Sequence, residues 1–172
     1  MSKDLYIQFL NDSIFFVNGT VDEKFLKKDI IKIIPNFTSN DLFEYIYQNY
    51  NNLHKNLFII DSINNDVITK LMYNKDIKYN KEYYLDIYNG KYGIIGKKPL
   101  NNYLNIKDIW INKLRFNIPT NNIYYYSNLY LVKREDIYKN SKEFYNYYLN
   151  IFKGNTINNH ILNIILHEIF KI

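Results

Sequence analysis

The sequence predicts a mixed α/β fold with a mostly parallel sheet, and three features of the 172-residue chain support this prediction. Apolar runs at residues 30–34 and 57–60 flank a segment whose apolar residues recur at helical spacing. A strand, a helix and a strand within about 30 residues form a βαβ unit, in which the two strands run parallel. A further helical pattern spans residues 157–169. Because the length suits one domain, we expect a single domain over residues 1–172.

The amino-terminal segment predicts two short strands ahead of this unit. Residues 5–10 are apolar and rich in strand formers, and residues 14–17 form a second such run. Asn11-Asp12-Ser13 between them is a turn signal, and Asn18-Gly19 after them tolerates positive φ. The two runs form either a hairpin or two separate strands.

The helix of the βαβ unit is expected to begin at Thr38. Thr38 precedes Asp41 by three residues, which is the spacing of a capping box. The apolar stripe of this helix consists of Leu42, Tyr45, Ile46, Tyr50 and Leu53. The continuous apolar run at residues 57–60 is typical of a buried parallel strand.

The second half of the chain predicts a series of short elements. A helix is expected at residues 67–72, followed by strands at 83–88, 92–95, 122–126 and 129–132, the last two around a Ser127-Asn128 turn. A helical stretch begins at Arg134, restarts near Ser141 and ends at Gly154-Asn155. Its apolar face consists of Phe144, Tyr145, Tyr148, Leu149 and Phe152.

The composition excludes several kinds of site. The chain has no Cys, which excludes disulfides and thiolate metal sites. It has neither a Gly-x-Ser-x-Gly elbow nor a His-Glu-x-x-His zinc motif. No apolar run approaches the ~20 residues that span a bilayer. Residues 1–10 lack a signal core, so we expect a cytoplasmic protein.

Codon bias explains the most unusual part of the composition. The chain has 28 Asn, 28 Ile and 19 Tyr but no Ala, and the favoured residues share A/T-rich codons, as in an AT-rich host or virus. Tyr and Lys therefore carry little weight as functional signals. The net charge of +5 is modest and the basic residues are scattered, so nucleic acid is not an expected partner.

Two carboxylates stand where a ligand of an open α/β sheet would bind. Asp61 directly follows the predicted buried strand, and such folds bind ligands beyond the carboxyl ends of their strands. Asp61, together with Asp66, could coordinate Mg²⁺ or Mn²⁺ on the diphosphate of a nucleotide sugar. The alternative is that Asp61 caps a turn.

A glycine-rich segment is the second candidate. Gly90, Gly93 and Gly96 precede Lys97-Lys98, and backbone N–H groups with ammonium charges can surround phosphate. The spacing matches neither the P-loop nor the dinucleotide-binding fingerprint, so a turn with solvated lysines is the simpler interpretation.

Two blocks of sequence contain motifs in a distinctive order. The first contains Ile33-Ile34-Pro35-Asn36, then DLFEYIYQNYNNL at residues 41–53 and LFII at residues 57–60. It is similar to the strand, Asn-centred turn, helix and following strand of a family of glycosyltransferase-like proteins found in fungi and large DNA viruses. The second runs from Trp110 through LVKREDI at residues 131–137 to KEFY at residues 142–145 and the final Ile-Phe. Together the blocks frame most of the chain from about residue 30 onward.

The resemblance implies a compact three-layer, Rossmann-like sandwich of the GT-A type and a sugar-nucleotide-dependent transferase. In that activity Asp61 and Asp66 would be the catalytic, metal-coordinating residues. Asn36 would shape the nucleotide pocket, and Lys97 or Arg134 would neutralise phosphate. The metal, Mg or Mn, would stabilise charge on the leaving diphosphate.

The chain departs from the family pattern mainly at polar positions. It has Thr38-Ser39-Asn40 where the family tends to show Gly-Arg-Glu, and Asp61-Ser62 where the family tends to show Gln-Gly. The apolar framework positions persist. We therefore expect a degenerate, non-catalytic binding or structural protein, of viral origin as one source. Its surface Tyr, Asn and Ile would contact a protein partner or a second copy. An active transferase is the alternative.

Overall fold

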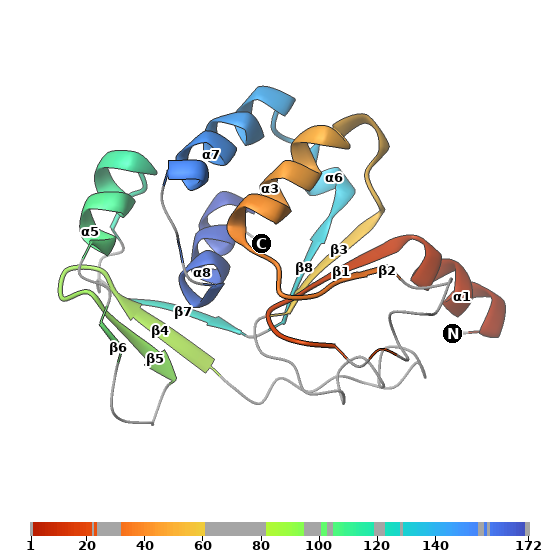
Figure 1. The fold of residues 1–172 in the computed structure, drawn as a ribbon, viewed down its shortest axis with the longest axis horizontal. Coiled ribbons are helices and arrows are strands. Elements are labelled where there is room, and N and C mark those ends of the chain that lie inside the picture. The colour runs from red at the N-terminus through yellow and green to blue at the C-terminus, as the bar shows by residue number, and fades with distance from the viewer. Residues whose placement is uncertain are drawn as a thin grey trace.

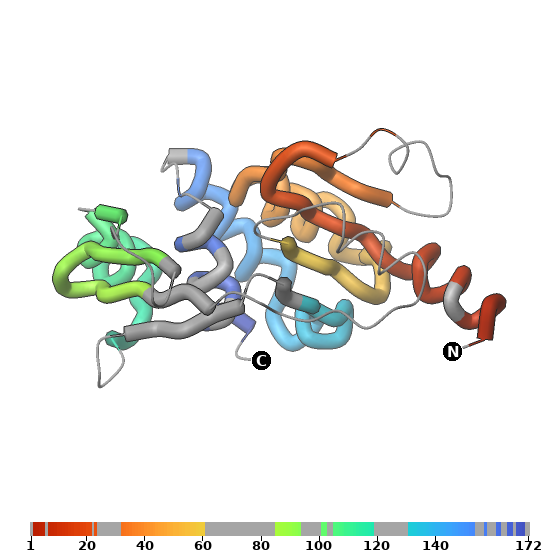
Figure 2. The backbone as a smooth tube through the Cα atoms, turned by 90° about the horizontal axis from the view of Figure 1, so that it is seen from below, coloured from red at the N-terminus to blue at the C-terminus, as the bar shows by residue number. Residues whose placement is uncertain are grey.

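The chain has a mixed α/β fold built on two four-stranded sheets (Figure 1). The structure is a computed structural model that describes residues 2–21, 23, 32–60, 82–94, 101–102, 105–118, 123–127, 129–154, 157 and 159–170. The predicted helix at 67–72 lies outside these residues. Figure 2 shows the sheets at different positions along the long axis, with α1 and the amino terminus at one end.

The first sheet has the strand order β2-β1-β3-β8. Its strands are β2 (Lys32–Ile34), β1 (Ser13–Val17), β3 (Asn56–Ile60) and β8 (Leu129–Lys133). Strand β1 pairs parallel with both β2 and β3, whereas β8 pairs antiparallel with β3. This sheet is therefore mixed, with its parallel pairs at the amino-terminal strands.

The second sheet has the order β6-β5-β4-β7, and its described pairs are all antiparallel. Its strands are β6 (Asn101–Asn102), β5 (Lys91–Ile94), β4 (Glu82–Asp86) and β7 (Ile123–Ser127). The expectation of a mostly parallel sheet thus fits the first sheet only. Strands β7 and β8 do not form a hairpin about Ser127-Asn128, because they belong to different sheets.

The predicted βαβ unit has the expected strand directions. Helix α3 (Ser39–Gln48) connects β2 with β3, and both strands run parallel to β1, which lies between them. Strand β1 precedes this unit in the sequence but lies between its two strands in the sheet. Strands β1, β2 and β3 consequently share one amino-terminal edge and one carboxyl-terminal edge.

The prediction of a strand at residues 5–10 was wrong, because this run lies in helix α1 (Lys3–Asn11). The Ser2 hydroxyl oxygen accepts a hydrogen bond of 3.2 Å from the N–H of Leu5, which caps the first turn. Helical geometry buries Leu10 (1 % exposed) and turns the other face outward. A local cap therefore outweighed the strand propensity of an apolar run.

Helix α3 begins with the predicted capping box. The Thr38 N–H donates to an Asp41 carboxylate oxygen at 2.8 Å, and the Asp41 N–H donates to the Thr38 hydroxyl at 3.2 Å. The helix is followed by a 3₁₀ turn, η1 (Tyr50–Asn52). The buried face of α3 consists of Ser39, Leu42, Phe43 and Ile46.

We expect Thr38→Ala to lower the free energy of unfolding by about 1 kcal/mol, because the Asp41 N–H at the start of α3 loses its hydroxyl acceptor. Urea unfolding followed by circular dichroism measures this change. Thr38→Ser is the matched control, because a serine hydroxyl at this position can accept the same bond from the Asp41 N–H. Equal stability of the two variants would show that the box contributes nothing.

The remaining helices of the described residues lie mainly on the same side of the sheets as α3 (Figure 1). They are α5 (Ile106–Asp108), the π-helical turn η2 (Ile109–Lys113), α6 (Arg134–Ile137), α7 (Lys142–Gly154) and α8 (Asn159–Phe170). The predicted apolar face of α7 is confirmed, since Tyr145, Tyr148, Leu149 and Phe152 are buried. Burial raises the pKa of Tyr148 to about 12. The turn α5–η2 was not predicted.

One hydrophobic cluster connects helices with both sheets. It includes Ile14 and Ile59 of the first sheet and Leu85 of the second. Helices α3 and α7 meet there through the rings of Phe43 and Phe152, whose centroids are 4.9 Å apart. The opposite face of the first sheet is also buried, and there Phe15 stacks on Phe58 at 4.9 Å.

Candidate functional site

The structure describes two of the five residues predicted for the site, Asn36 and Arg134. Asp61, Asp66 and Lys97 lie outside the described residues, so the proposed metal and phosphate contacts of these three remain predictions.

Asn36 lies at the carboxyl-terminal edge of the parallel strands. It follows β2 in the left-handed conformation, with φ 51°, which asparagine tolerates better than most residues. Its N–H donates to the carbonyl of Gly19 at 3.0 Å, and the side chain is exposed. At the same edge the N–H of Asn18 donates to the carbonyl of Ile60 at 2.8 Å. Ile60 is the residue before Asp61, so the chain leaves β3 at the edge where Asn36 stands.

Arg134 lies at the opposite edge. The backbone N–H of Arg134 donates a hydrogen bond of 2.9 Å to the backbone carbonyl of Lys55, the residue before β3. A strand rises about 3.3 Å per residue, so the five residues of β3 place the two edges on the order of 15 Å apart. The structure therefore does not bring Arg134 and Asn36 together.

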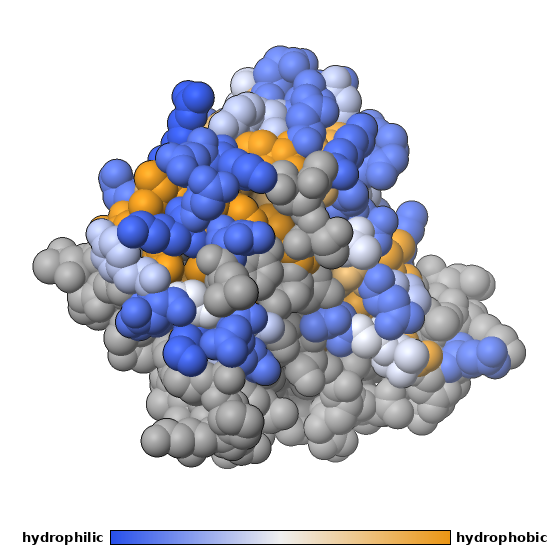
Figure 3. Space-filling model, turned by 60° about the vertical axis from the view of Figure 1, so that its left-hand side comes forward, coloured by the Kyte–Doolittle hydropathy of each residue, from blue (hydrophilic) through white to orange (hydrophobic). Residues whose placement is uncertain are grey.

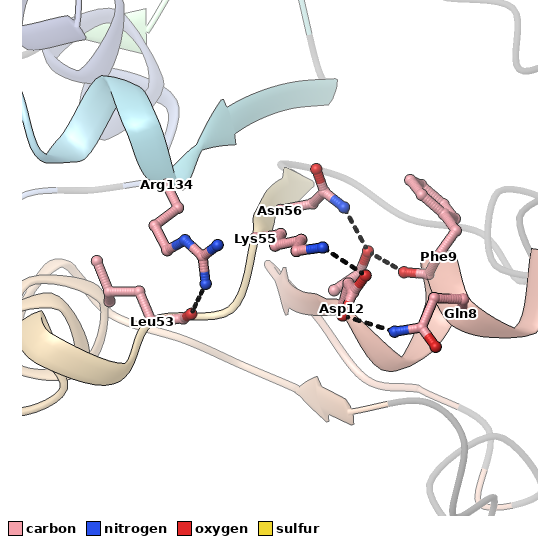
Figure 4. A network of polar contacts seen from close by, with 8 residues as sticks. Gln8, Phe9, Asp12, Leu53, Lys55, Asn56 and Arg134 are labelled. Carbon is pink, nitrogen blue, oxygen red and sulfur yellow. Dashed lines mark hydrogen bonds and ion pairs between the residues drawn. The ribbon is translucent and has the colours of Figure 1, made fainter. Parts of the chain in front are cut away.

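A polar cavity of about 260 Å³ opens at the amino-terminal edge, and we name it the amino-edge basin. It collects residues from the end of α1, the segment before β3 and the start of α6. Figure 4 shows Arg134 and Lys55 reaching into this region from different elements, with Asp12 beyond Lys55. The residues that line the basin include Asp12, Asn52, Leu53, His54, Lys55 and Arg134.

Two contacts orient the charged side chains of the basin. The Arg134 guanidinium donates from Nη1 to the carbonyl of Leu53 at 3.2 Å. Lys55 Nζ lies 3.6 Å from an Asp12 carboxylate oxygen, and the Lys55 side chain is 58 % exposed. An exposed ion pair at this distance contributes little to stability. Lys55 is therefore free to exchange Asp12 for another anion.

A buried serine connects the elements that lie beside the basin. The Ser13 hydroxyl donates to the carbonyl of Phe9 at 2.6 Å and accepts from the Asn56 amide at 3.2 Å (Figure 4). Ser13 is 1 % exposed, so these bonds form away from water. They tie the last turn of α1 to β1 and β3, which fixes Asp12 relative to Lys55.

His54 is held by a tyrosine of α3. The Tyr45 hydroxyl oxygen accepts the His54 backbone N–H at 3.1 Å and lies 2.6 Å from His54 Nδ1. Burial lowers the pKa of His54, the charge of Lys32 lowers it further, and Asp12 opposes both effects. Burial also raises the pKa of Tyr45. The imidazole is thus neutral near pH 7 and bonded to a neutral phenol.

His54 lines the basin, and its partner Tyr45 lines a second cavity of about 330 Å³. This apolar hollow lies between α3 and the edge of the first sheet. Its lining includes Ile14, Phe16, Ile34 and Tyr45, with Lys32 and Glu44 among the polar residues.

We expect the stability of the protein to fall as the pH drops from about 7.5 to about 5, in part through His54. The folded protein holds the His54 pKa below its ordinary value of 6.5. The stability that this group contributes is therefore complete above pH 6.5 and is lost as the pH falls through the folded pKa. Urea unfolding across this range should give a shallower pH slope for His54→Gln than for the wild type. Equal slopes would contradict the assignment.

The sequence did not single out Asp12, His54 or Lys55. A signal existed in Asn51-Asn52-Leu53-His54-Lys55-Asn56, a polar stretch between a helix and a buried strand. Such a stretch marks the amino-terminal edge of a sheet. Ligands of open α/β folds bind at the carboxyl edge, so the site was predicted there.

Comparisons of the chain with protein-family models, with curated proteins and with solved structures give no match. The glycosyltransferase-like resemblance therefore stays a prediction. Within the described ranges, no three His, Asp or Glu side chains are grouped so that they could hold a metal ion. No described helix has both the length and the apolar character that crossing a bilayer requires.

Proposed function

We propose that the chain is a non-catalytic binding protein on a glycosyltransferase-like α/β framework, with its ligand site at the amino-edge basin. The observation that carries this proposal is the separation of Arg134 from Asn36 by the length of β3. A transferase site of the expected kind needs a phosphate-neutralising cation beside the nucleotide pocket. Of the two candidates for this cation, only Arg134 is among the described residues. Arg134 instead lies with Lys55 and His54 at the other edge.

The residues of the first resembling block support a framework without its original chemistry. The apolar positions Leu42, Ile46 and Leu57 are buried in the main hydrophobic cluster. Thr38 is one of the polar positions at which the chain departs from the family, and in the structure it caps α3. We extend the proposal to a Rossmann-like, three-layer arrangement of the GT-A type, supported by the parallel strands that α3 connects.

A protein contact is part of the same proposal. Large exposed side chains include Tyr88 at 56 %, Tyr147 at 44 % and Ile111 at 37 %. Tyrosine is favoured at protein interfaces because it offers apolar area and a hydroxyl together. On the face turned forward in Figure 3, hydrophobic atoms show between hydrophilic side chains, as they do on a surface that can dock a partner or a second copy.

Thermal unfolding with UDP- and GDP-sugars plus Mn²⁺ tests the non-catalytic assignment. We expect no shift in the melting temperature that depends on Asp61, for any donor. A ligand at 100 times its dissociation constant would stabilise the protein by about 2.7 kcal/mol, which such an experiment resolves. A shift that Asp61→Asn abolishes and Asp4→Asn retains would contradict the proposal.

An active transferase remains the second candidate, because one observation favours it. Strands β1, β2 and β3 end at the same edge, and the chain passes from Ile60 directly to Asp61 there. Turnover of a nucleotide sugar that depends on Asp61 and on Mn²⁺ would establish this function and exclude the non-catalytic one.

A further inference from the structure

We infer that the amino-edge basin binds the oxyanion group of a small ligand, either a phosphate or a carboxylate. This inference rests on the proposed binding function and adds the chemical class of the ligand. It depends on the charge of the basin, on the fixed guanidinium of Arg134 and on the proton of His54.

The charges that line the basin sum to an excess of one positive charge. Lys55 and Arg134 contribute two cations and Asp12 contributes one carboxylate, while His54 is neutral near pH 7. Lys32 adds to the positive potential, because its charge is one cause of the lowered His54 pKa. An anion entering the cavity therefore meets a favourable field.

The guanidinium of Arg134 has the geometry that binds an oxyanion. A guanidinium carries five N–H donors in a planar fork, and the bond from Nη1 to the Leu53 carbonyl uses one of them. That bond fixes the plane of the group without neutralising its charge. Among the described residues the guanidinium has no carboxylate partner, so the rest of the fork is available for two parallel bonds to oxyanion oxygens.

The Tyr45 contacts determine where the neutral imidazole of His54 carries its proton. The Tyr45 oxygen accepts the His54 backbone N–H, and its own hydroxyl proton is satisfied when it donates to Nδ1. The imidazole proton then resides on Nε2. His54 lines the basin, and we assign its Nε2–H as a third donor beside Arg134 and Lys55. An anion bound there would raise the pKa of His54, and it would bind more tightly at lower pH.

The dimensions of the basin limit the ligand to a small group. A cavity of about 260 Å³ lies just below the ~300–1,000 Å³ of drug-sized ligand sites, so it suits an oxyanion group rather than a long chain of nucleic acid. The neighbouring apolar hollow has two carboxylates, Asp41 and Glu44, against one cation, Lys32, on its lining, and this excess of negative charge disfavours an anion. The oxyanion is therefore assigned to the basin alone.

Titration of the full chain with inorganic phosphate and, separately, with acetate tests the inference. Two-dimensional NMR at constant ionic strength, with chloride as the reference anion, follows the His54 ring and the backbone amides. We expect at least one of the two anions to bind with a dissociation constant of about 1 mM or tighter. Phosphate binding alone identifies a phosphate ligand, and tighter acetate binding identifies a carboxylate.

Variants locate the binding. Arg134→Gln should weaken the affinity by about tenfold or more, because it removes a charge-assisted, bidentate contact. Arg134→Lys, which keeps the charge and loses the fork, should fall between the wild type and Arg134→Gln. Arg115→Gln is the matched control at the other arginine of the chain and should bind like the wild type. Circular dichroism confirms that each variant is folded.

Two results would overturn the inference: neither anion binds, or Arg134→Gln and Arg115→Gln bind equally. Lys55→Gln guards against a folding defect in the arginine variants, because Lys55 is exposed and its loss should weaken binding without unfolding the chain. Absence of anion binding would leave a non-catalytic protein with an uncharged ligand. Turnover of nucleotide sugars would refute the proposed function whether or not phosphate binds.

Discussion

Phe43→Ala is expected to lower the free energy of unfolding by about 3–5 kcal/mol. Phe43 is fully buried, with its ring centroid 4.9 Å from that of Phe152 and 5.9 Å from that of Tyr148. The truncation removes the aromatic contact between α3 and α7 and leaves a cavity that neighbouring rings cannot fill without leaving their rotamers.

Urea unfolding followed by the fluorescence of Trp110, the single tryptophan, measures this loss. Leu5→Ala is the control, because Leu5 is 63 % exposed and its truncation should change stability by about 0.5 kcal/mol or less. Similar losses for the two variants would mean that α3 and α7 do not pack as described.

Ile59→Asp should have the largest effect of all, a loss of about 4 kcal/mol or more that abolishes cooperative folding if the protein is marginally stable. Ile59 is completely buried in β3, where it pairs with Phe16 of β1 and with Tyr130 of β8 in register. An aspartate there must either ionise without a partner or remain protonated at the cost of a raised pKa. Both outcomes destabilise the centre of the first sheet.

Ile59→Val is the matched control and should cost about 0.5–1.5 kcal/mol, because it removes one methylene group. Circular dichroism and thermal unfolding compare the two. A folded, cooperatively unfolding Ile59→Asp protein with a melting temperature near that of Ile59→Val would contradict the central position of β3.

Local patterns predicted the elements whose apolar residues recur at a clear period. The capping box of α3, the buried positions Leu42 and Ile46 of its predicted stripe and the apolar face of α7 come directly from residues three and four positions apart. Tyr50 and Leu53 of that stripe lie beyond the end of α3 at Gln48. The strand prediction for residues 5–10 was wrong because a six-residue apolar segment suits a strand and a short helix equally. The Ser2 cap favours the helix.

Long-range arrangement could not be predicted in the same way. Nothing in the sequence of β1 indicates that it lies between β2 and β3, or that β7 and β8 join different sheets. Arg134 and Asn36 were candidates for one phosphate and nucleotide site, yet they lie at opposite edges of the first sheet. Strand β8 runs antiparallel to β3, so the residue after it emerges beside Lys55 rather than beside Asn36.

The amino-edge basin could not be predicted for the same reason, because its residues meet only through long-range strand pairing. Its lining comes from three places, at Asp12, at residues 52–55 and at Arg134, and each looks like a polar turn when taken alone. Pairing of β1 with β3, and of β3 with β8, brings these turns to one edge.

Mapping backbone amide shifts during titrations with phosphate and with acetate tests most directly whether the ligand site lies at the amino-terminal edge. For the anion that binds, we expect the largest changes at Asp12, at residues 53–55 and at Arg134, and we expect Arg134→Gln to remove them. Changes that centre instead on Asn18, Gly19 and Asn36 at the carboxyl-terminal edge would contradict this expectation.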